Sequence, residues 1–365
     1  MTRLVILSPN WLGDAVMALP AIADVRRAAP DARITVAARQ AIAPLFRLVP
    51  DVNDTIVLST PAAIHDVGRW RALGAELAGG GFDTALLLPN SMHAALLVSR
   101  AGIPERWGYR SGWRGSVLTR AIQRPSGLHQ VEFYQQLVHA LGFPNGPVEP
   151  RVHVAQDARD AAARLLIDDG WDGHTPLVAL APGAAYGSAK RWPPEYFGEL
   201  AATLATDGVG SVIVGSAADA ATAADVGRAF DQNVGRAFDQ NVARAFDQNV
   251  ARAFQARVGG PARAALHDLV GRTDLPALAG VLTHCRALVT NDSGAMHLGA
   301  AAGVSVTAVF GPTDDTATRP LGDAHRVLTH PVWCRPCMLR ECPIDHRCMH
   351  GVGVAAVLAS ARRTL

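Results

Sequence analysis

The chain has 365 residues, of which 49% are hydrophobic, and this length is more easily accommodated by two domains than by one core. A formal net charge of +2 and an aromatic content of 6% argue against a nucleic-acid-binding protein, which needs a strongly basic surface or stacking side chains. No apolar run approaches the roughly 20 residues that cross a bilayer, so we expect no transmembrane segment.

The first half of the chain predicts alternating strands and helices. A helix-like stretch at 15–28 follows the first of four apolar runs, and the predicted strands are Leu4–Leu7, Ile34–Ala37, Thr55–Leu58 and Thr84–Leu88. Such alternation is typical of a parallel sheet covered by helices. The first strand follows Met1-Thr2-Arg3 directly, without the apolar core of a signal peptide, so we expect a cytoplasmic protein.

A carboxylate follows the first predicted strand. Asp14 stands after the turn that contains Asn10 and just before the predicted helix. Because open α/β sheets bind ligands at the carboxyl ends of their strands, Asp14 is a candidate general base that takes a proton from an incoming hydroxyl group. The alternative is an ordinary helix N-cap.

Aromatic and basic residues gather between 107 and 120. Such a segment can dock a soluble enzyme on an anionic bilayer, which leaves a membrane-bound substrate open. A solvated loop with packed tryptophans is the alternative. The residues concerned are Trp107, Arg110, Trp113, Arg114 and Arg120.

The second half repeats this plan after a stretch rich in Pro and Gly at 142–150, which indicates the approach to a linker. Its predicted strands are Leu177–Ala181, Ser211–Val214, Ala287–Val289 and Ser305–Phe310. We therefore predict two doubly wound, Rossmann-like domains, an N-terminal one at 1–170 and a C-terminal one at 171–365.

The turn after the first strand of the second half is a candidate phosphate site. It contains Gly183, Ser188 and Lys190, and a lysine there can reach a phosphate oxygen as a point charge while Ser188 donates its hydroxyl. A solvated surface lysine is the alternative. After the next strand, Asp219 is a candidate acceptor of hydrogen bonds from a ribose, or else a cap of the following helix.

A second strand-to-helix turn contains Asp292, Ser293 and Gly294, and His297 follows in the predicted helix. The unpaired backbone N–H groups and the positive dipole end of such a helix hold an anion. A capping Asp292 and a packed His297 are the alternatives. Two such turns in one half of the chain suggest a pyrophosphate site, and therefore nucleotide chemistry.

Residues 226–254 contain an eight-residue repeat, present three times with a fourth, truncated copy. Its Val and Phe recur every four residues, so an apolar stripe would turn by about 40° around the helix at each step. We expect an insertion in a helix or surface loop, without a catalytic role, with a partner-binding arm as the alternative.

Four of the five cysteines crowd into one segment at 334–348, with His346 among them and His350 just after it. Such spacing can hold a structural zinc ion or an iron–sulfur cluster, although a second Cys-x-x-Cys pair is missing. The candidate ligands are Cys334, Cys337, Cys342 and Cys348.

In this order, the motifs resemble the ADP-heptose:lipopolysaccharide heptosyltransferases, glycosyltransferase family 9. The start at Trp11–Asp14 and the element Leu88–Ser91 look more like type II of this family than type I. The other matching segments are Gly108–Arg110, Pro182–Pro193, Gly215–Asp219, Thr290–Gly294, Met296-His297 and Phe310–Thr313. The resemblance implies the GT-B architecture, in which two Rossmann-like domains face each other across a cleft. The repeat departs from the family pattern.

The resemblance further implies an inverting transfer of heptose from ADP-L-glycero-β-D-manno-heptose to the inner-core heptose of a lipid A–Kdo precursor at the inner face of the inner membrane, with no cofactor required. Asp14 would be the base, and Lys190 would stabilise the departing ADP. The other donor-side residues would be Gly183, Ser188, Asp219, Asp292, Ser293, Gly294 and His297, and the acceptor-side candidates are Asn10, Asn90, Ser91 and Arg110.

Other functions stay open at this point. A GT-B transferase with another nucleotide sugar, or a type I or type III heptosyltransferase, would share the fold. A dehydrogenase is disfavoured because Ser8–Gly13 lacks the Gly-x-Gly-x-x-Gly pattern after the first strand. A nucleotide-binding scaffold protein, built around the repeat and the cysteines, is the alternative that is not an enzyme.

Overall fold

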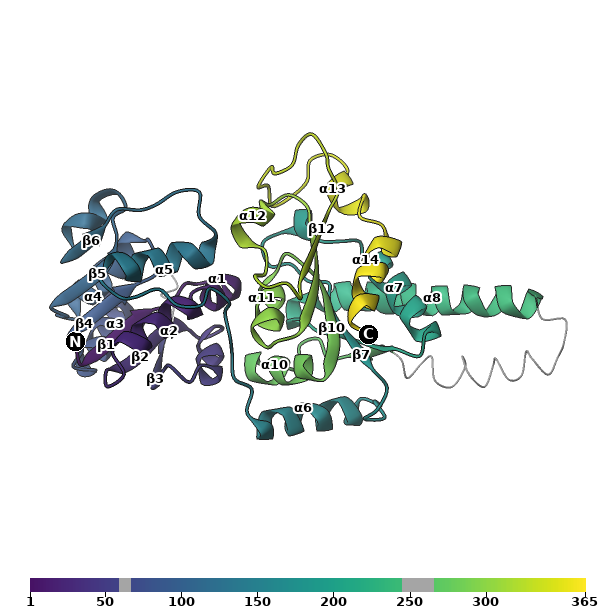
Figure 1. Cartoon of the computed structure of the whole chain (residues 1–365), viewed down its shortest axis with the longest axis horizontal. Helices are drawn as coiled ribbons and strands as arrows, with labels where there is room; N and C mark the ends of the chain where they lie inside the picture. The colour runs from purple at the N-terminus through teal and green to yellow at the C-terminus, as the bar shows by residue number, and fades with distance from the viewer. Residues whose placement is uncertain (59–66, 245–265) are drawn as a thin grey trace. The chain divides into compact units, whose positions relative to one another are not determined.

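The computed structural model describes residues 1–58, 67–244 and 266–365, and the chain separates into two compact units, Met1–His153 and Val154–Leu365 (Figure 1). Each unit contains one six-stranded sheet in which neighbouring strands are parallel. Helices flank both sheets. The predicted α/β class with two doubly wound units is therefore confirmed.

The sheet of the first unit has the strand order β3-β2-β1-β4-β5-β6, which is that of the Rossmann fold. Its strands are β1 (Arg3–Leu7), β2 (Arg33–Arg39), β3 (Asp54–Leu58), β4 (Thr84–Leu87), β5 (Glu105–Tyr109) and β6 (Arg120–Ile122). Its helices are α1 (Leu12–Met17), α2 (Leu19–Ala28), α3 (Val67–Gly79), α4 (Met92–Arg100) and α5 (Gln130–Ala140). Strands β5 and β6 were not predicted, because β5 opens on two charged residues and β6 has only three residues.

The predicted helix at 15–28 is two helices, and the first of them begins earlier than expected. Helix α1 begins at Leu12, where the carbonyl of Trp11 accepts a hydrogen bond from the N–H of Ala15 at 2.9 Å. Asp14 therefore lies in the first turn of α1 and is not its N-cap. Helix α1 ends at Met17, and Ala18 stands between the two helices as the N-cap of α2.

Apolar side chains cover both faces of the first sheet. On one face, Leu73 of α3 and Val98 of α4 pack with Val5 of β1 in a buried cluster. The alternate residues of β1, Leu4 and Ile6, are also fully buried, as expected for a strand with helices on both sides.

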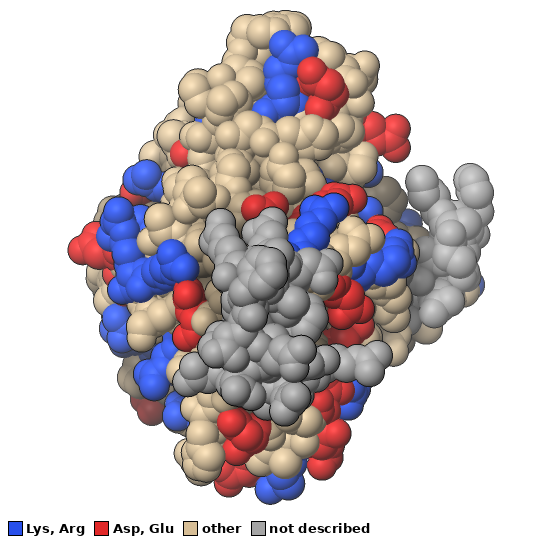
Figure 2. Space-filling model, turned by 90° about the vertical axis from the view of Figure 1, so that its right-hand side faces the viewer, with Lys and Arg blue, Asp and Glu red and all other residues tan. Residues whose placement is uncertain are grey.

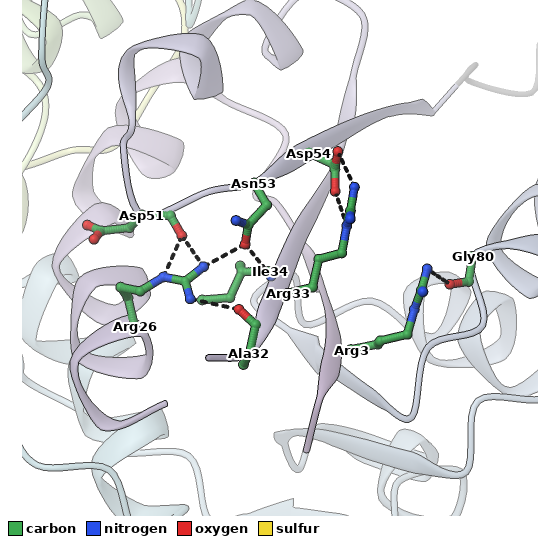
Figure 3. Close-up of polar contacts among 9 residues, drawn as sticks. All are labelled: Arg3, Arg26, Ala32, Arg33, Ile34, Asp51, Asn53, Asp54 and Gly80. Atoms are coloured by element: carbon green, nitrogen blue, oxygen red, sulfur yellow. Dashed lines mark hydrogen bonds and ion pairs between the residues drawn. The ribbon is translucent and has the colours of Figure 1, made fainter. Parts of the chain in front are cut away.

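Arginine side chains close the amino end of this sheet (Figure 3). Arg26 of α2 donates to the carbonyl of Asp51 at 2.9 and 3.1 Å and to Oδ1 of Asn53 at 2.6 Å. Arg33 of β2 forms an ion pair with Asp54 of β3 at 2.7 Å. The polar groups at this end are therefore satisfied within the protein.

The sheet of the second unit has the order β12-β11-β10-β7-β8-β9. When the strands are numbered within each unit, this order is the same as that of the first sheet. Strands β7 and β10 are therefore the central pair of the second sheet, as β1 and β4 are the central pair of the first. Its strands are β7 (Leu177–Ala181), β8 (Gly210–Ile213), β9 (Leu266–Asp268), β10 (Cys285–Asn291), β11 (Ser305–Phe310) and β12 (Arg326–Thr329). Its described helices are α6 (Gln156–Asp168), α7 (Pro194–Thr206), α8 (Ala220–Arg244), α10 (Leu275–Thr283), α11 (Gly294–Ala301), α12 (Asp315–Thr318), α13 (Arg347–His350) and α14 (Val354–Ala361).

The boundary between the units lies at His153, not near residue 170 as predicted. Helix α6 follows this boundary and lies beside α10 of the second unit (Figure 1). The two helices approach closely: a Cβ atom on Gly280 would lie 2.9 Å from the carbonyl oxygen of Ala158 and 2.9 Å from Cβ of Ala162. Because α6 buries its apolar face there, it belongs to the second unit, and the Pro/Gly stretch at 142–150 precedes the boundary.

The first copy of the repeat lies in helix α8, one of the two predicted settings (a helix or a surface loop), and contributes to the core. Val226 and Phe230 are buried in α8 against α7, where a Cβ atom on Gly198 would lie 2.7 Å from the N of Phe230. A four-residue spacing keeps two side chains on nearly one face before the stripe drifts. Helix α8 then continues away from the sheet (Figure 1), and the repeat beyond Arg244 lies outside the described residues.

On the side of the molecule where α8 ends, acidic and basic side chains are interspersed (Figure 2). Such a face produces no strong field of a single sign. None of the described helices is both long and apolar enough to cross a membrane.

Candidate active site

The turns after β7 and β10 are tied together at the carboxyl end of the second sheet. Asn291, the last residue of β10, donates from Nδ2 to the carbonyl of Pro182 at 2.7 Å, and its Oδ1 accepts from the backbone N–H of Trp192 at 2.9 Å. Trp192 is fully buried and donates from Nε1 to the carbonyl of Val352 at 2.7 Å. The segment that carries Lys190 is therefore anchored to the centre of the sheet.

Lys190 and Asp292, predicted separately, form an ion pair. The distance from Nζ of Lys190 to Oδ2 of Asp292 is 2.5 Å, and the two side chains are 12% and 7% exposed. The hydroxyl of Thr313 donates to the same carboxylate oxygen at 2.6 Å. Lys190 is thus not a solvated surface lysine, and Asp292 is not the N-cap of α11, which is Ser293.

The start of α11 lies beside this pair. Ser293 has an extended backbone and does not cap the helix with its hydroxyl, which instead lies 3.1 Å from that of Thr290. The N–H groups of the first turn therefore keep their capacity to bind an anion. Gly294 begins the helix, and His297 is buried one turn further on.

Asp219 and Gly183 come together from the turns after β8 and β7. Oδ2 of Asp219 accepts hydrogen bonds from the N–H and the hydroxyl of Ser216, at 2.9 and 2.8 Å, which is a capping box ahead of α8. A Cβ atom on Gly183 would lie 2.4 Å from Oδ1 of Asp219, so any side chain there would have to displace the Asp219 carboxylate. Ser188 is exposed at the start of the short turn that ends at Lys190.

The cysteine-rich segment packs on the loop of Lys190. The hydroxyl of Tyr186 donates to the carbonyl of Met338 at 2.8 Å, and the N–H of Ala189 donates to the carbonyl of Arg340 at 3.0 Å. Nζ of Lys190 and the guanidinium carbon of Arg340 lie 4.6 and 5.2 Å from the centroid of the Tyr186 ring. Arg340 thus brings a second cation to this end of the sheet.

Sequence reasoning did not assign Thr313, Tyr186 or Arg340 to the site. Thr313 and Tyr186 stand inside the quoted segments Phe310–Thr313 and Pro182–Pro193, so a signal existed for both. No quoted segment contains Arg340, because only the packing of a distant segment brings this residue to the site.

The four clustered cysteines are free thiols. Burial, and to a smaller extent the charges of the other three thiols, raise the pKa of Cys348. Among the described residues, no group of three or more His, Cys, Asp or Glu side chains is placed so that it could hold a metal ion. A zinc or iron–sulfur site at Cys334, Cys337, Cys342 and Cys348 stays a prediction.

In the first unit, Asp14 lies near Tyr134 of α5. Burial, and to a smaller extent the negative charge of Asp14, raise the pKa of Tyr134. Asp14 is half-buried, whereas Asn10 in the preceding turn is exposed. Because α1 follows β1 after a short turn, Asp14 in its first turn lies at the carboxyl end of the sheet, where a base would meet its substrate.

The acceptor-side candidates after β4 have different surroundings. Asn90 is half-buried, and its Oδ1 accepts a hydrogen bond from Nη1 of Arg114 at 3.1 Å. Ser91 is the N-cap of α4 and accepts from the N–H of Ala94 at 3.2 Å. Arg110 is exposed after β5. Since β1 and β4 are neighbours, Asn90 and Asp14 follow adjacent strands.

The predicted aromatic and basic docking surface is only partly present. Trp113 is 87% exposed, but Trp107 is 9% exposed and Arg114 only 1%. Trp107 is buried because it lies in β5, with Arg120 stacked on its ring at 5.2 Å. The packed-tryptophan alternative therefore holds for Trp107, and Arg114 belongs to the interior.

Comparisons with known proteins agree with this arrangement. The model of glycosyltransferase family 9 (heptosyltransferase) matches residues 70–237 and 247–347. The lipopolysaccharide heptosyltransferase 2 of Salmonella typhimurium is 28% identical over 335 residues, which cover 89% of this chain and 87% of that protein. The protein of the same name from Escherichia coli K12 has the same identity and coverage.

A solved structure of the Escherichia coli ADP-heptose lps heptosyltransferase II is similar to this chain, with a TM-score of 0.78 and 27% sequence identity. The match covers 100% of this chain and 98% of that one. The family model spans well over half of the sequence, so the protein is an enzyme that belongs to glycosyltransferase family 9, the heptosyltransferases.

Proposed function

We propose that the enzyme transfers a heptose from ADP-L-glycero-β-D-manno-heptose to the inner-core heptose of a lipid A–Kdo lipopolysaccharide precursor. The observation that carries the donor side is the buried pair of Lys190 and Asp292 beside the uncapped start of α11. The relatives named lipopolysaccharide heptosyltransferase 2 support the choice of sugar and acceptor.

On the donor side, the bond between the anomeric carbon and the diphosphate oxygen breaks, and its electron pair leaves with ADP. Lys190 and the N–H groups at Ser293 and Gly294 would stabilise the charge that develops there. Asp292 holds Lys190 in place, and His297 and Asp219 would contact the donor. This set of protein groups supplies positive charge itself, so the scheme requires no cofactor.

On the acceptor side, Asp14 would accept the proton as the acceptor hydroxyl attacks the anomeric carbon. The start of α1 favours the ionised carboxylate. A single displacement from the face opposite ADP inverts the configuration at that carbon. Asn10, Asn90, Ser91 and Arg110 would contact the acceptor, and the enzyme would work in the cytoplasm at the inner face of the inner membrane.

The test is ADP release from the purified enzyme with ADP-heptose, with and without a heptosyl-Kdo-lipid A acceptor. UDP- and GDP-sugars serve as donor controls, and an acceptor without the first heptose distinguishes type I activity. Release that depends on both ADP-heptose and the heptosylated acceptor is the expected result. Turnover of another nucleotide sugar instead would overturn the donor assignment.

A further inference from the structure

A buried cation with almost no partners lies at the carboxyl end of the first sheet. Arg114, in the short turn Gly112–Ser116, is 1% exposed. Its Nε and Nη2 are buried and have no hydrogen-bond partner among the described residues. A buried donor left in this state is rare in a native protein and needs an explanation, because the lost hydration is not replaced.

No carboxylate offsets this charge. Among the described residues, Arg114 forms no ion pair, and burial alone lowers its pKa to about 10, so it stays charged at neutral pH. Asp24, a fully buried acidic residue in the same unit, has both Arg27 and Gln135 as partners. The first unit therefore gives Asp24 a cationic partner, whereas Arg114 has no anionic partner among the described residues.

Strand β5 leaves room for the Arg114 side chain because residue 108 is a glycine. Gly108 of β5 lies beside Leu87 of β4, and a Cβ atom on Gly108 would be 2.7 Å from Nη2 of Arg114. Any side chain at 108 would displace the guanidinium group. A glycine in the middle of a strand is otherwise unfavourable, so its presence marks a close approach.

Among the described residues, the one hydrogen-bond partner of the Arg114 side chain is Asn90, an acceptor-side candidate. A guanidinium group can only donate, so the amide oxygen of Asn90 must face Nη1, at 3.1 Å. The two N–H bonds of Asn90 Nδ2 are therefore turned away from Arg114. The adjacent positive charge polarises this amide, which strengthens its hydrogen bonds to an anionic oxygen.

We propose that Asn90 and Arg114 form a subsite for an anionic group of the acceptor. This inference rests on the proposed function and deepens it. Nδ2 of Asn90 contacts a carboxylate or phosphate oxygen of the acceptor, and Arg114 is a positioning residue that fixes the amide and supplies the positive charge. The acceptor then binds only when its anionic group faces this corner of the sheet.

Asn90→Asp is the first test, because it keeps the size of the side chain, removes the donor and gives Arg114 a counter-charge. We expect the acceptor KM to rise about 10- to 100-fold, with a smaller change in kcat, an unchanged ADP-heptose KM, and a Tm equal to or above that of the wild type. Arg114→Lys keeps the charge and should lose less than Arg114→Gln. Arg100→Gln, which removes an exposed charge from α4 of the same unit, is the matched control.

Two modified acceptors identify the anion. One carries methyl-esterified Kdo carboxylates and the other lacks the lipid A phosphates. If one modified acceptor binds to the wild type as weakly as to Asn90→Asp, the anionic group that it lacks is the one that the subsite binds. An unchanged acceptor KM in Asn90→Asp, or a lower Tm with equal losses for donor and acceptor, would overturn the subsite and indicate a purely structural role.

Binding of the unmodified acceptor, measured by its effect on Tm, separates this inference from the proposed function. If the wild type binds the acceptor through Asn90 but releases no ADP from ADP-heptose, the subsite stands and the proposed function fails. If it releases ADP and Asn90→Asp matches it in every parameter, only the subsite fails.

Discussion

The second unit gives its buried cation an acidic partner, whereas the first unit gives its buried cation a neutral one. In each unit the partner follows the fourth strand of the same strand order: Asp292 after β10 and Asn90 after β4. Lys190 is paired with Asp292, whose carboxylate also accepts a hydrogen bond from the hydroxyl of Thr313. Arg114 has only an amide, and its charge is left for something outside the described chain.

This difference shows what the fold decides and what the side chains decide. The strand order places both partners next to the central pair of strands, where open α/β sheets bind ligands. The choice between Asp and Asn then determines whether the cation faces a carboxylate or a neutral amide. Equivalent positions in two similar sheets can thus serve a donor and an acceptor.

The largest effect is expected from the residue that has no counterpart in the second unit. Asp14→Asn should lower turnover by about 10²–10⁴-fold, the range for a lost general base. ADP-heptose binding should change little, because the donor-side residues lie in the second unit. Steady-state kinetics and calorimetric titration with ADP-heptose measure the two quantities. Asp31→Asn, an exposed acid of the first unit, is the control, and full activity of Asp14→Asn would remove Asp14 from the mechanism.

Removing Lys190 from its ion pair with Asp292 should lower both the rate of the reaction and the stability of the protein. Lys190→Ala should lower kcat by about 10²–10³-fold and weaken ADP-heptose binding. It also leaves Asp292 buried without its cation, at a cost of about 3–5 kcal/mol in the free energy of unfolding. The double variant Lys190→Ala/Asp292→Asn should recover stability but not activity. If the single variant unfolds at the wild-type temperature, the pair is not a buried ion pair in solution.

The close approach of two turns in the second unit should tolerate no side chain. Gly183→Ala places a Cβ atom against Asp219 and should cost about 1–3 kcal/mol of stability while raising the donor KM several-fold. Gly227→Ala in α8, where nothing lies within 4 Å, should instead stabilise by about 0.5–1 kcal/mol. Thermal unfolding of both variants checks this contrast, and equal shifts would contradict it.

The smallest effect concerns the amino end of the first sheet, away from either site. Asp83 accepts hydrogen bonds from the N–H groups of Thr2 and Arg3 at 2.6 and 3.0 Å. Burial raises its pKa, but these bonds and those from the Thr2 and Thr84 hydroxyls lower it further, so the net pKa lies below its ordinary value. Its contribution is thus present above the unfolded-state pKa near 3.9 and is lost as pH falls towards the folded-state value.

Asp83→Asn should therefore cost about 1–3 kcal/mol at neutral pH and leave activity unchanged. The difference from the wild type should shrink below about pH 4. Urea unfolding at pH 7 and pH 3 measures it. A difference that stays constant between the two pH values would show that ionisation of Asp83 plays no part.

Much of the fold could be predicted from local patterns. The buried strand β7 is a continuous apolar run, and both β7 and β11 lie at the residues predicted for them. Strand β5 was missed because Glu105, Arg106 and Gly108 interrupt that pattern. The glycine at 108 is explained only by the tertiary structure, in which the Arg114 side chain lies against it.

The candidate site divides in the same way. The motifs around Asp14, Lys190 and Asp292 identify residue types suited to proton transfer and phosphate binding, because those chemistries need particular side chains next to strand ends. The pairing of Lys190 with Asp292, separated by 102 residues, depends on β7 and β10 being neighbours. The boundary at His153 agrees with the Pro/Gly stretch just upstream, whereas the assignment of α6 to the second unit depends on its packing on α10.

By itself, then, the sequence determined the fold class, the family and the residues that stand at strand ends, because apolar periodicity and turn chemistry are local properties. Only the tertiary structure decided that Lys190 is paired with Asp292, that Arg340 from the cysteine-rich segment joins it, and that Arg114 is buried with Asn90 as its one side-chain partner among the described residues. Burial and charge pairing are set by which distant segments pack together, and local sequence carries no record of that.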